Sequence, residues 1–349
     1  KVSKEYLLKS IKEGTEWLVI GTHSLIQKSI DFKNLGLVII DEQHRFGIKQ
    51  RKELISKHED LIPHFLSMTA TPIPRTLALS IYGDLDLSIL DEMPKNRKTI
   101  ITKIVPKLRE KAMFEFIRKE IKNGRQAFVI CPRIEESTEE EKSKNIFSFD
   151  QLLNYEVKAV KKEVEEMKKI FPEFKIEMLH GKMKSKDKEL IMTKFNKNEI
   201  NMLVSTSVLE VGIDVPNATI MLIMGTESFG LAQLHQFRGR VGRGMYQSYC
   251  FLCTESNSKT TKERLGAMVD CHDGFKLAEI DLKLRGPGEM FGRNQSGFPD
   301  LAMSALKDAK MLKNIQNEAK LLFATDPEFE KYPLFLERYK EFVEKIHME

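Results

Sequence analysis

The sequence predicts an α/β protein: two parallel-sheet domains followed by a helical segment. Short apolar runs rich in β-branched residues alternate with helical stretches, which is typical of parallel sheets covered by helices. The alternation pauses at the polar, proline-containing stretch "DEMPKNRKT" (91–99), which reads as a linker. It resumes in a second block of the same layout and gives way to helical sequence after residue 257. We therefore expect domains at 1–93, 94–257 and 258–349.

In the first block, the positions of the apolar runs and of the helical stretches set the expected order of elements. We expect a helix at 4–13, strands at 17–22 and 37–41, a helix at 50–58, a strand at 64–69, a helix at 74–82 and a strand at 85–90.

The second block repeats this order on a larger scale. We expect a strand at 99–105, a helix at 108–123, a strand at 127–131, an acidic surface insert at 133–145, a helix at 151–171, a strand at 175–179, a helix at 186–196, strands at 201–205 and 218–224, a helix at 232–238 and a strand at 248–254. Beyond residue 257 we expect an αα-hairpin turning near Asp273-Gly274, a glycine- and proline-rich loop at 285–297, and closing helices.

Composition narrows the class of protein. Hydrophobic residues make up 41% and charged residues 31% of the chain, and no apolar run could span a bilayer, so we expect a cytoplasmic protein with no membrane partner. A net charge of +5 permits a nucleic-acid partner without requiring one. Cys250 and Cys253 have CxxC spacing but lie in an expected strand, so their side chains should point to opposite faces. We therefore expect core thiols rather than a metal or redox site.

Two carboxylates follow the apolar run "LVII" (37–40). Asp41 and Glu42 at a strand end could hold a magnesium ion and orient a water against a phosphate. An acidic cap on the next helix is the alternative. Thr69-Ala70-Thr71 ends the next expected strand, and the carboxyl ends of parallel strands meet along one ligand crevice. The presence of Thr69-Ala70-Thr71 at the same edge favours the magnesium site over the acidic cap.

The second block contains "QLHQFRGRVGRG" (233–244). Gln236, Arg240 and Arg243 follow the pattern Q-x-x-G-R-x-x-R, and on a helix the two arginines would project from one face. Two guanidiniums fixed in this way would clamp a phosphate. A surface basic patch, or arginines that pair with the acidic insert, are the alternatives. Glycines 239, 242 and 244 argue against an ordinary helix end.

Six motifs in this order resemble those of superfamily 2 nucleic-acid translocases: "IGTHSL", "DEQH", "TAT", "MLHGKM", "STSVLEVGIDVP" and "QFRGRVGR". More narrowly, "DEQHRFGIKQR", "MTATPIPRTLALSIYGDLDLS" and "DLKLRGPGEMFGRNQSG" resemble the RecG family of branched-DNA helicases. The resemblance implies two RecA-like motor domains and a C-terminal helical hairpin with a translocation motif.

The resemblance also implies roles in ATP hydrolysis. Asp41, beside Glu42, would hold the Mg²⁺ of ATP, and Glu42 would polarise the attacking water. Gln43 and His44 would couple hydrolysis to the domain interface. The remaining residues with such roles would be Thr69, Ala70 and Thr71 as a relay between the ATP and DNA sites, Gly212 and Asp214 at the ribose or the interdomain network, and Gln236, Arg240 and Arg243 reaching across the cleft, with the arginines on the γ-phosphate.

On DNA, the resemblance implies contacts with the backbone that do not read sequence. These would come from hydroxyls and main-chain N–H groups at Gly21, Thr22, His180, Gly181, Ser205 and Thr206. In the translocation motif, Arg285 and Gln295 would lie in or beside the loop that engages the helicase motifs, and Glu289 could pair with a nearby arginine.

A phosphate loop, G-x-x-x-x-G-K-[ST], does not occur in the sequence. Only "HGKM" offers Gly-Lys, and Met183 stands where a hydroxyl must bind magnesium. The resemblance puts this loop upstream, so we expect a C-terminal piece whose first motor domain is N-terminally truncated. Such a piece should be inactive alone and prone to self-association through its uncovered sheet edge and apolar face.

The expected function is that of an ATP-dependent double-stranded DNA translocase, or helicase, that remodels replication forks and Holliday-type junctions in repair and recombination. Branched DNA and a single-stranded-DNA-binding protein are the implied partners, and ATP and Mg²⁺ the implied cofactors. Three alternatives stay open: a translocase like the transcription-repair coupling factor, an RNA helicase of the DEAD/DEAH kind, and a non-hydrolysing scaffold that binds nucleic acid or a protein. The stretch "DLKLRGPGE" has no role in the RNA helicase.

Overall fold

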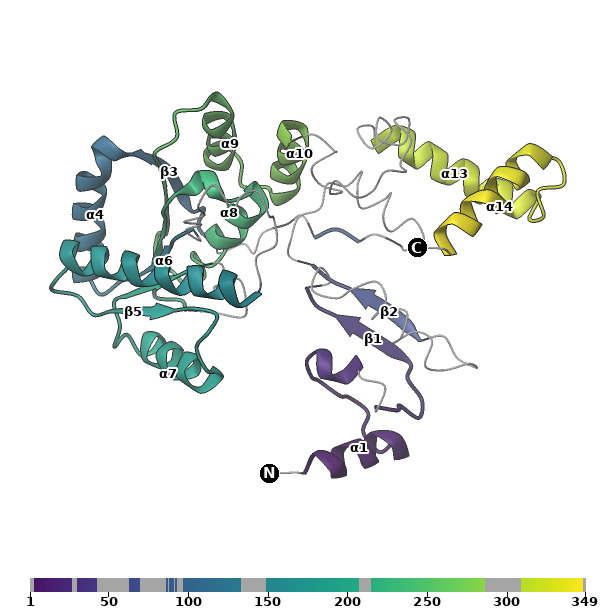
Figure 1. Ribbon diagram of the computed structural model, residues 1–349, viewed down its shortest axis with the longest axis horizontal. Helices are drawn as coiled ribbons and strands as arrows, with labels where there is room; N and C mark the ends of the chain where they lie inside the picture. The colour runs from purple at the N-terminus through teal and green to yellow at the C-terminus, as the bar shows by residue number, and fades with distance from the viewer. Residues whose placement is uncertain are drawn as a thin grey trace. The chain divides into compact units, whose positions relative to one another are not determined.

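The computed structural model describes residues 3–26, 30–42, 63–69, 86, 88–90, 92, 97–132, 149–206, 215–285 and 309–347 (Figure 1). Two compact units, Lys1–Pro72 and Ile73–Glu349, make up the chain, and each is described by itself. The helices expected at 50–58 and 74–82, the acidic insert and the glycine-rich loop lie outside the described residues.

The first unit contains a short helix and two paired strands. Helix α1 (Lys4–Glu13) begins where the Ser3 hydroxyl accepts the N–H of Tyr6 and ends at Gly14, whose φ is 74°. A 3-10 turn, η1 (His23–Ile26), follows. Strands β1 (Leu37–Ile40) and β2 (His64–Ser67) pair in parallel, as the alternation of apolar runs predicts.

The strand expected at 17–22 is wrong. These residues are irregular in the structure, and the Trp17 side chain is 99% exposed. A segment with strand propensity forms a strand only when it can pair with a neighbouring strand. In the described part of this unit, the sheet consists of β1 and β2, which pair with each other. Residues 86 and 88–90 of the strand expected at 85–90 are likewise irregular.

The second unit contains a six-stranded, fully parallel sheet in the order β3-β8-β7-β4-β6-β5. Each strand lies within two residues of an expected one, which confirms the predicted α/β class. The strands are β3 (Ile101–Pro106), β4 (Gln126–Ile130), β5 (Ile176–Leu179), β6 (Met202–Ser205), β7 (Ala218–Ile223) and β8 (Tyr249–Thr254).

Helices cover both faces of this sheet. One face packs against α4 (Glu110–Lys122) and α6 (Phe149–Ile170), through side chains such as Ile117 and Met167. The other packs against α7 (Ser185–Asn196), α8 (Leu231–Arg238), α9 (Lys259–Asp270) and α10 (Gly274–Arg285). Strands β4, β6 and β7 are buried at every position, which explains why their sequences are apolar except at Gln126, Ser205 and Thr219. Helices α9 and α10 form the hairpin that the sequence predicts, with its turn at 271–273.

Three of the four cysteines are core residues. Cys250 packs in the cluster on one face and Cys253 in the cluster on the other, as the strand period predicts. Burial raises the pKa of Cys250 and of Cys131 to about 12. Cys271, after α9, is the fourth cysteine and is only partly buried.

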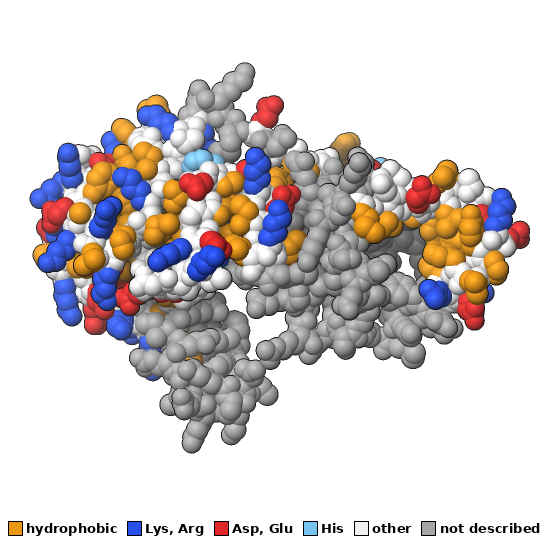
Figure 2. All heavy atoms as spheres, turned by 90° about the horizontal axis from the view of Figure 1, so that it is seen from above, with side chains coloured by type: hydrophobic (Ala, Val, Ile, Leu, Met, Phe, Trp, Pro, Cys, Tyr) orange, Lys and Arg blue, Asp and Glu red, His pale blue; other side chains and the backbone are white. Residues whose placement is uncertain are grey.

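Two further helices, α13 (Ala309–Thr325) and α14 (Pro333–His347), pack around Phe329. The rings of Phe323, Phe335 and Tyr339 lie 5.0, 5.1 and 5.8 Å from its ring. Hydrophobic side chains also gather on the outside of this pair (Figure 2), where Leu334 is 76% exposed. No helix in the described ranges is long and apolar enough to cross a membrane.

Glu163 on α6 makes stability depend on pH. Burial, and then Glu166, raise the pKa of Glu163 to about 7, and its Oε1 has no hydrogen-bond partner in the described part of the chain. The unfolded chain ionises near 4.5 while the folded one stays neutral, so stability falls as pH rises from about 4.5 to 7. The loss above pH 7 is about 2–3 kcal/mol.

Glu163→Gln should therefore unfold at higher urea than the parent chain at pH 8.5, and the difference should shrink towards pH 4. Chemical unfolding followed by circular dichroism at both pH values measures it. Glu165→Gln, on the exposed side of α6, is the matched control and should give the same small difference at both pH values. A difference for Glu163→Gln that does not change with pH would contradict the assignment.

Candidate nucleotide and nucleic-acid sites

The carboxylates of the first unit lie at the carboxyl end of β1. Asp41 is exposed, and its Oδ1 accepts the N–H of Glu42 at 2.9 Å. Glu42 has φ 52°, a left-handed conformation that a residue with a Cβ adopts only at a cost. The main chain at Glu42, directly after the strand, therefore has an unusual conformation, and the exposed Asp41 precedes it.

The structure brings Thr69 to the same edge, as predicted. Ile40 is opposite Ser67 in the register, and the N–H of Met68 donates to the Ile40 carbonyl at 2.8 Å. The first residues beyond each strand are thus neighbours. Of the other predicted residues in this stretch, Gln43, His44, Ala70 and Thr71 lie outside the described residues.

Gly21 and Thr22 are both exposed and lead into η1. A Cβ on Gly21 would lie 2.8 Å from Cγ of Leu25, so only glycine fits this approach without a shift. The Thr22 hydroxyl lies 3.3 Å from that of Ser24. Main-chain and hydroxyl groups are therefore presented at the surface here.

In the second unit, the predicted DNA-binding residues meet at the carboxyl edge of the sheet. His180-Gly181 follows β5 and Thr206 follows β6, and these strands pair with Leu179 opposite Ser205. His180 and Gly181 are partly exposed, whereas Ser205 and Thr206 are fully buried. Of the four, the pair after β5 is therefore the accessible one. Gly212 and Asp214 lie outside the described residues.

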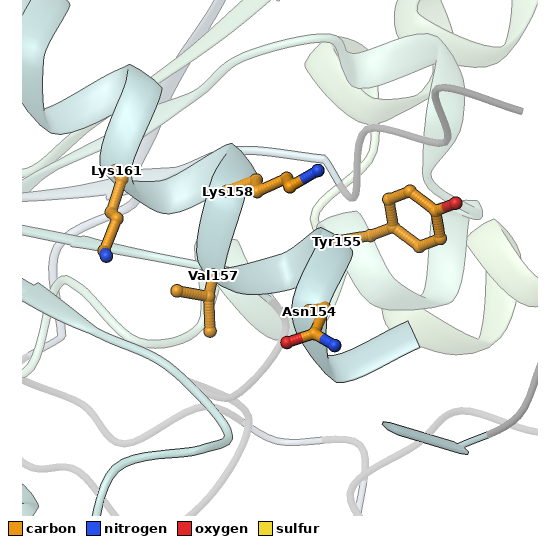
Figure 3. Close-up of a pocket in the computed structure, with 5 residues that line it drawn as sticks. All are labelled: Asn154, Tyr155, Val157, Lys158 and Lys161. Atoms are coloured by element: carbon orange, nitrogen blue, oxygen red, sulfur yellow. The ribbon is translucent and has the colours of Figure 1, made fainter. Parts of the chain in front are cut away.

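A pocket lies on α6 (Figure 3). Its lining is Asn154, Tyr155, Val157, Lys158 and Lys161. Lys182 donates to Asn154 Oδ1, and Lys188 donates to the Gly181 carbonyl at 3.1 Å.

These ammonium groups make the surroundings of His180 cationic. Burial, then Lys161 and Lys188, lower the pKa of His180, so its imidazole is neutral at physiological pH. A cationic hollow of this kind can bind an anion such as a backbone phosphate.

The arginines do not share a helical face, and this prediction is wrong. Helix α8 ends at Arg238 with Gly239 as its cap, so Arg240 and Arg243 lie in the loop 239–248, here named the arginine loop. Gly242 has φ 79°, which takes the chain out of the helical path. A Cβ on Gly244 would lie 2.4 Å from the Pro216 carbonyl oxygen, so the loop runs against the start of β7.

The arginine loop is at the amino edge of the sheet. A Cβ on Gly242 would meet Ile100, just before β3, at 2.9 Å, and the N–H of Ile101 donates to the Ser248 carbonyl at 3.0 Å. The arginines and His180-Gly181 therefore lie at opposite ends of the strands. Gln236 is on α8, partly buried.

Arg238 is a structural residue that the sequence reasoning missed. Its guanidinium is 3% exposed and donates to the carbonyls of Met268 at 2.7 Å and Cys271 at 3.1 Å, at the end of α9. It also lies 3.0 Å from Nδ1 of His235, whose pKa is lowered to about 4 by burial and then by Arg238. Arg238 thus joins the helix before the arginine loop to the α9–α10 hairpin.

Arg264 on α9 makes a second link between these parts. Its Nη2 donates to the Glu227 carbonyl, in the segment before α8, at 2.9 Å. Arg285 is the last residue of α10, while Glu289 and Gln295 lie outside the described residues.

Three family profiles match the chain in order. "DEAD/DEAH box helicase" matches residues 1–79, "Helicase conserved C-terminal domain" residues 109–245, and "ATP-dependent DNA helicase RecG, domain 3, C-terminal" residues 271–346.

The chain is also similar to curated proteins named ATP-dependent DNA helicase RecG. It is 48% identical to the one from Synechocystis over 90% of this chain and 36% of that protein. It is 47% identical to the one from Aquifex aeolicus over 94% of this chain and 40% of that protein. A solved structure described as RecG bound to a three-way DNA junction matches with a TM-score of 0.66 and 41% identity, over 89% of this chain and 38% of that one. The chain therefore spans less than half the length of these relatives.

Replacing Arg238 should loosen the link between α8 and α9. Arg238→Met keeps much of the volume but leaves the Met268 and Cys271 carbonyls without their donor, which costs about 2–4 kcal/mol of stability. Chemical unfolding measures the loss. Arg109→Met, on an exposed arginine, should change stability by less than about 0.5 kcal/mol. Equal losses in the two variants would show that the buried contacts carry no special weight.

Proposed function

This chain belongs to the RecG family of ATP-dependent DNA helicases, whose C-terminal helicase portion it spans, and we propose that it supplies part of an ATP-driven motor acting on branched double-stranded DNA. The observation that carries the proposal is the order of the two helicase segments and the RecG segment along one chain. The remodelling of forks and Holliday-type junctions in repair and recombination is the proposed task of the whole protein. A relative bound to a three-way junction supports branched DNA as the substrate.

The proposed ATP chemistry uses residues of two sequence motifs. The exposed Asp41 carboxylate suits Mg²⁺, which prefers oxygen ligands, and Glu42 beside it would orient the attacking water. Magnesium bound there would neutralise phosphate charge. Arg240 and Arg243 would stabilise charge that develops on the γ-phosphate. The motifs alone support the other proposed coupling and nucleotide residues. These are Gln43, His44, Thr69, Ala70, Thr71, Gly212, Asp214, Gln236, Arg285, Glu289 and Gln295.

The proposed DNA contacts are to the backbone. In the first unit, main-chain and hydroxyl donors to phosphate oxygens would come from Gly21 and Thr22. In the second unit, such donors would come from His180-Gly181 and from the lysine ammonium groups of the α6 pocket. Affinity should therefore fall steeply with salt. Ser205 and Thr206 are buried and would support this edge from within. A single-stranded-DNA-binding protein and a cytoplasmic location complete the proposal.

A scaffold that binds nucleic acid or protein without hydrolysing ATP is the second candidate. The motif residues Asp41, Glu42, Arg240 and Arg243 argue against it, because a protein that does not hydrolyse ATP would not need them. A translocase like the transcription-repair coupling factor is the third, and the RecG profile over residues 271–346 argues against it.

The chain by itself should show negligible DNA-stimulated ATPase activity. Without a phosphate loop to cradle the β- and γ-phosphates, we expect ATP to bind with a Kd on the order of 1 mM or weaker. A coupled ATPase assay with forked DNA measures turnover, and Arg243→Ala is the control. Turnover well above that of the control would contradict the expectation.

The first unit should self-associate through the β1–β2 sheet. Leu37, Ile39 and Leu66 are 54%, 54% and 48% exposed on one face of the two paired strands, and such an apolar face favours association. Light scattering at about 50 μM should give a mass above that of the 40.3 kDa monomer.

Ile39→Lys should return the monomer, because a charge on the face opposes its burial. Leu108→Lys is the matched control on the second unit, where the parent side chain is 98% exposed, and it should leave association unchanged. A monomeric parent chain would overturn the expectation.

A further inference from the structure

Arg97 lies in the linker before β3 and binds the arginine loop. Its Nε donates to the Gly242 carbonyl at 3.1 Å, and its Nη2 lies 3.5 Å from the Gly239 carbonyl. One guanidinium thus reaches two carbonyls far away in sequence. Neither the motifs nor the family profiles assign this residue a role, since the profiles leave residues 80–108 unmatched.

Each of the two acceptor residues directly precedes one of the two arginines. Gly239 precedes Arg240 directly and Gly242 precedes Arg243 directly, so each bond holds the peptide group from which one of the arginines projects. Gly239 is also the cap of α8, where the helix leaves carbonyls without intrahelical partners and a cation is favourable. A planar guanidinium can donate to both carbonyls at once, whereas a lysine ammonium has no such fixed fork.

Three other contacts join the same two segments. Gln247 Nε2 donates to the Thr99 carbonyl at 2.7 Å, and Ile101 N–H donates to the Ser248 carbonyl at 3.0 Å. Ile100 fills the space beside Gly242. The linker from residue 97 to residue 101 therefore runs along the arginine loop and is bonded to it at both ends.

We propose that Arg97 is a positioning residue for Arg240 and Arg243, which fixes the arginine loop to the linker and so preorganises the two guanidiniums for a polyphosphate. The proposal rests on the proposed function in one respect, the role of the two arginines as phosphate ligands. A loop fixed before binding loses less conformational entropy when it binds. A displacement of the linker is also transmitted directly to the peptide groups that carry the arginines.

Amide hydrogen exchange of the 349-residue chain tests whether Arg97 holds the arginine loop in place. Arg97→Ala should speed exchange in residues 239–247 about tenfold, since the loop then opens without the rest of the sheet, while β4 and β7 keep their rates. Lys98→Ala removes the same charge from the neighbouring exposed residue and should leave every rate unchanged. Unchanged loop rates in Arg97→Ala overturn the proposal.

A second variant covers the case in which Arg97→Ala unfolds. Gln247→Ala removes the separate bond to the Thr99 carbonyl, and it should speed exchange over the same residues by a smaller factor. If Gln247→Ala leaves the loop rates at the parent values, the linker does not hold the loop and the proposal falls.

Binding of inorganic tripolyphosphate, followed by the NMR shifts of the amides of residues 240–244, tests the consequence. Arg97→Ala should weaken binding about three- to tenfold, Lys98→Ala should not, and Arg97→Lys should restore part of the affinity through one carbonyl. A faster-exchanging loop with parent affinity would overturn the positioning role.

Arg240→Ala and Arg243→Ala separate this proposal from the proposed function. If both variants keep the parent affinity for tripolyphosphate, the arginines are not phosphate ligands and the proposed function loses its support. The exchange result for Arg97→Ala would still stand in that case, so the two failures can be told apart.

Discussion

The second unit depends on one constraint: its central strands are buried on both sides. Every residue of β4, β6 and β7 is buried, so each face of the sheet must be covered by helices. Burying one Phe, Ile or Leu side chain contributes about 1.5–3 kcal/mol, and truncating one in a core costs about 2–5 kcal/mol. Polar groups that a ligand could reach are thereby concentrated at the two ends of the strands. That division sets His180-Gly181 at one end and the arginine loop at the other.

A buried polar group fixes the amino end of the sheet. The Gln126 side chain is fully buried, and its Nε2 donates to the carbonyls of Phe195 at 2.6 Å and Ile200 at 2.7 Å. Its Oε1 accepts from Asn217 Nδ2 at 3.1 Å. Both polar atoms of the Gln126 amide are therefore hydrogen-bonded in the core. These bonds connect the end of α7 to the starts of β4 and β7. The register between these strands shifts at this residue.

Much of the fold could be predicted from the sequence, because the apolar runs and helical stretches of the second block are long and locally consistent. All six strands of the second sheet follow from their apolar runs, and the opposite faces of Cys250 and Cys253 follow from the period of a strand. The strand at 17–22 does not, because the residues have strand propensity without a neighbour to pair with among the described strands.

The candidate sites were harder to predict. Strand ends place Asp41 and Thr69 together, which the pattern predicts. The helix through Arg240 and Arg243 is wrong because Gly239 and Gly242 end it, and a motif's spacing does not reveal φ. Arg97 and Arg238 act through carbonyls more than 25 residues away, so nothing local marks them. Long-range contacts to backbone carbonyls leave almost no trace in the side-chain pattern.

The cysteines also have a practical consequence. Three of the four thiols are buried and one, Cys271, is only partly buried, with its Sγ donating to the Asp273 carbonyl at 3.4 Å in the turn between α9 and α10. The Cys271 carbonyl is one of the acceptors that hold Arg238. A maleimide fluorophore or spin label would therefore attach at this one position without any engineered cysteine. Its signal would report on the α9–α10 hairpin and on the contact of this hairpin with Arg238 in solution.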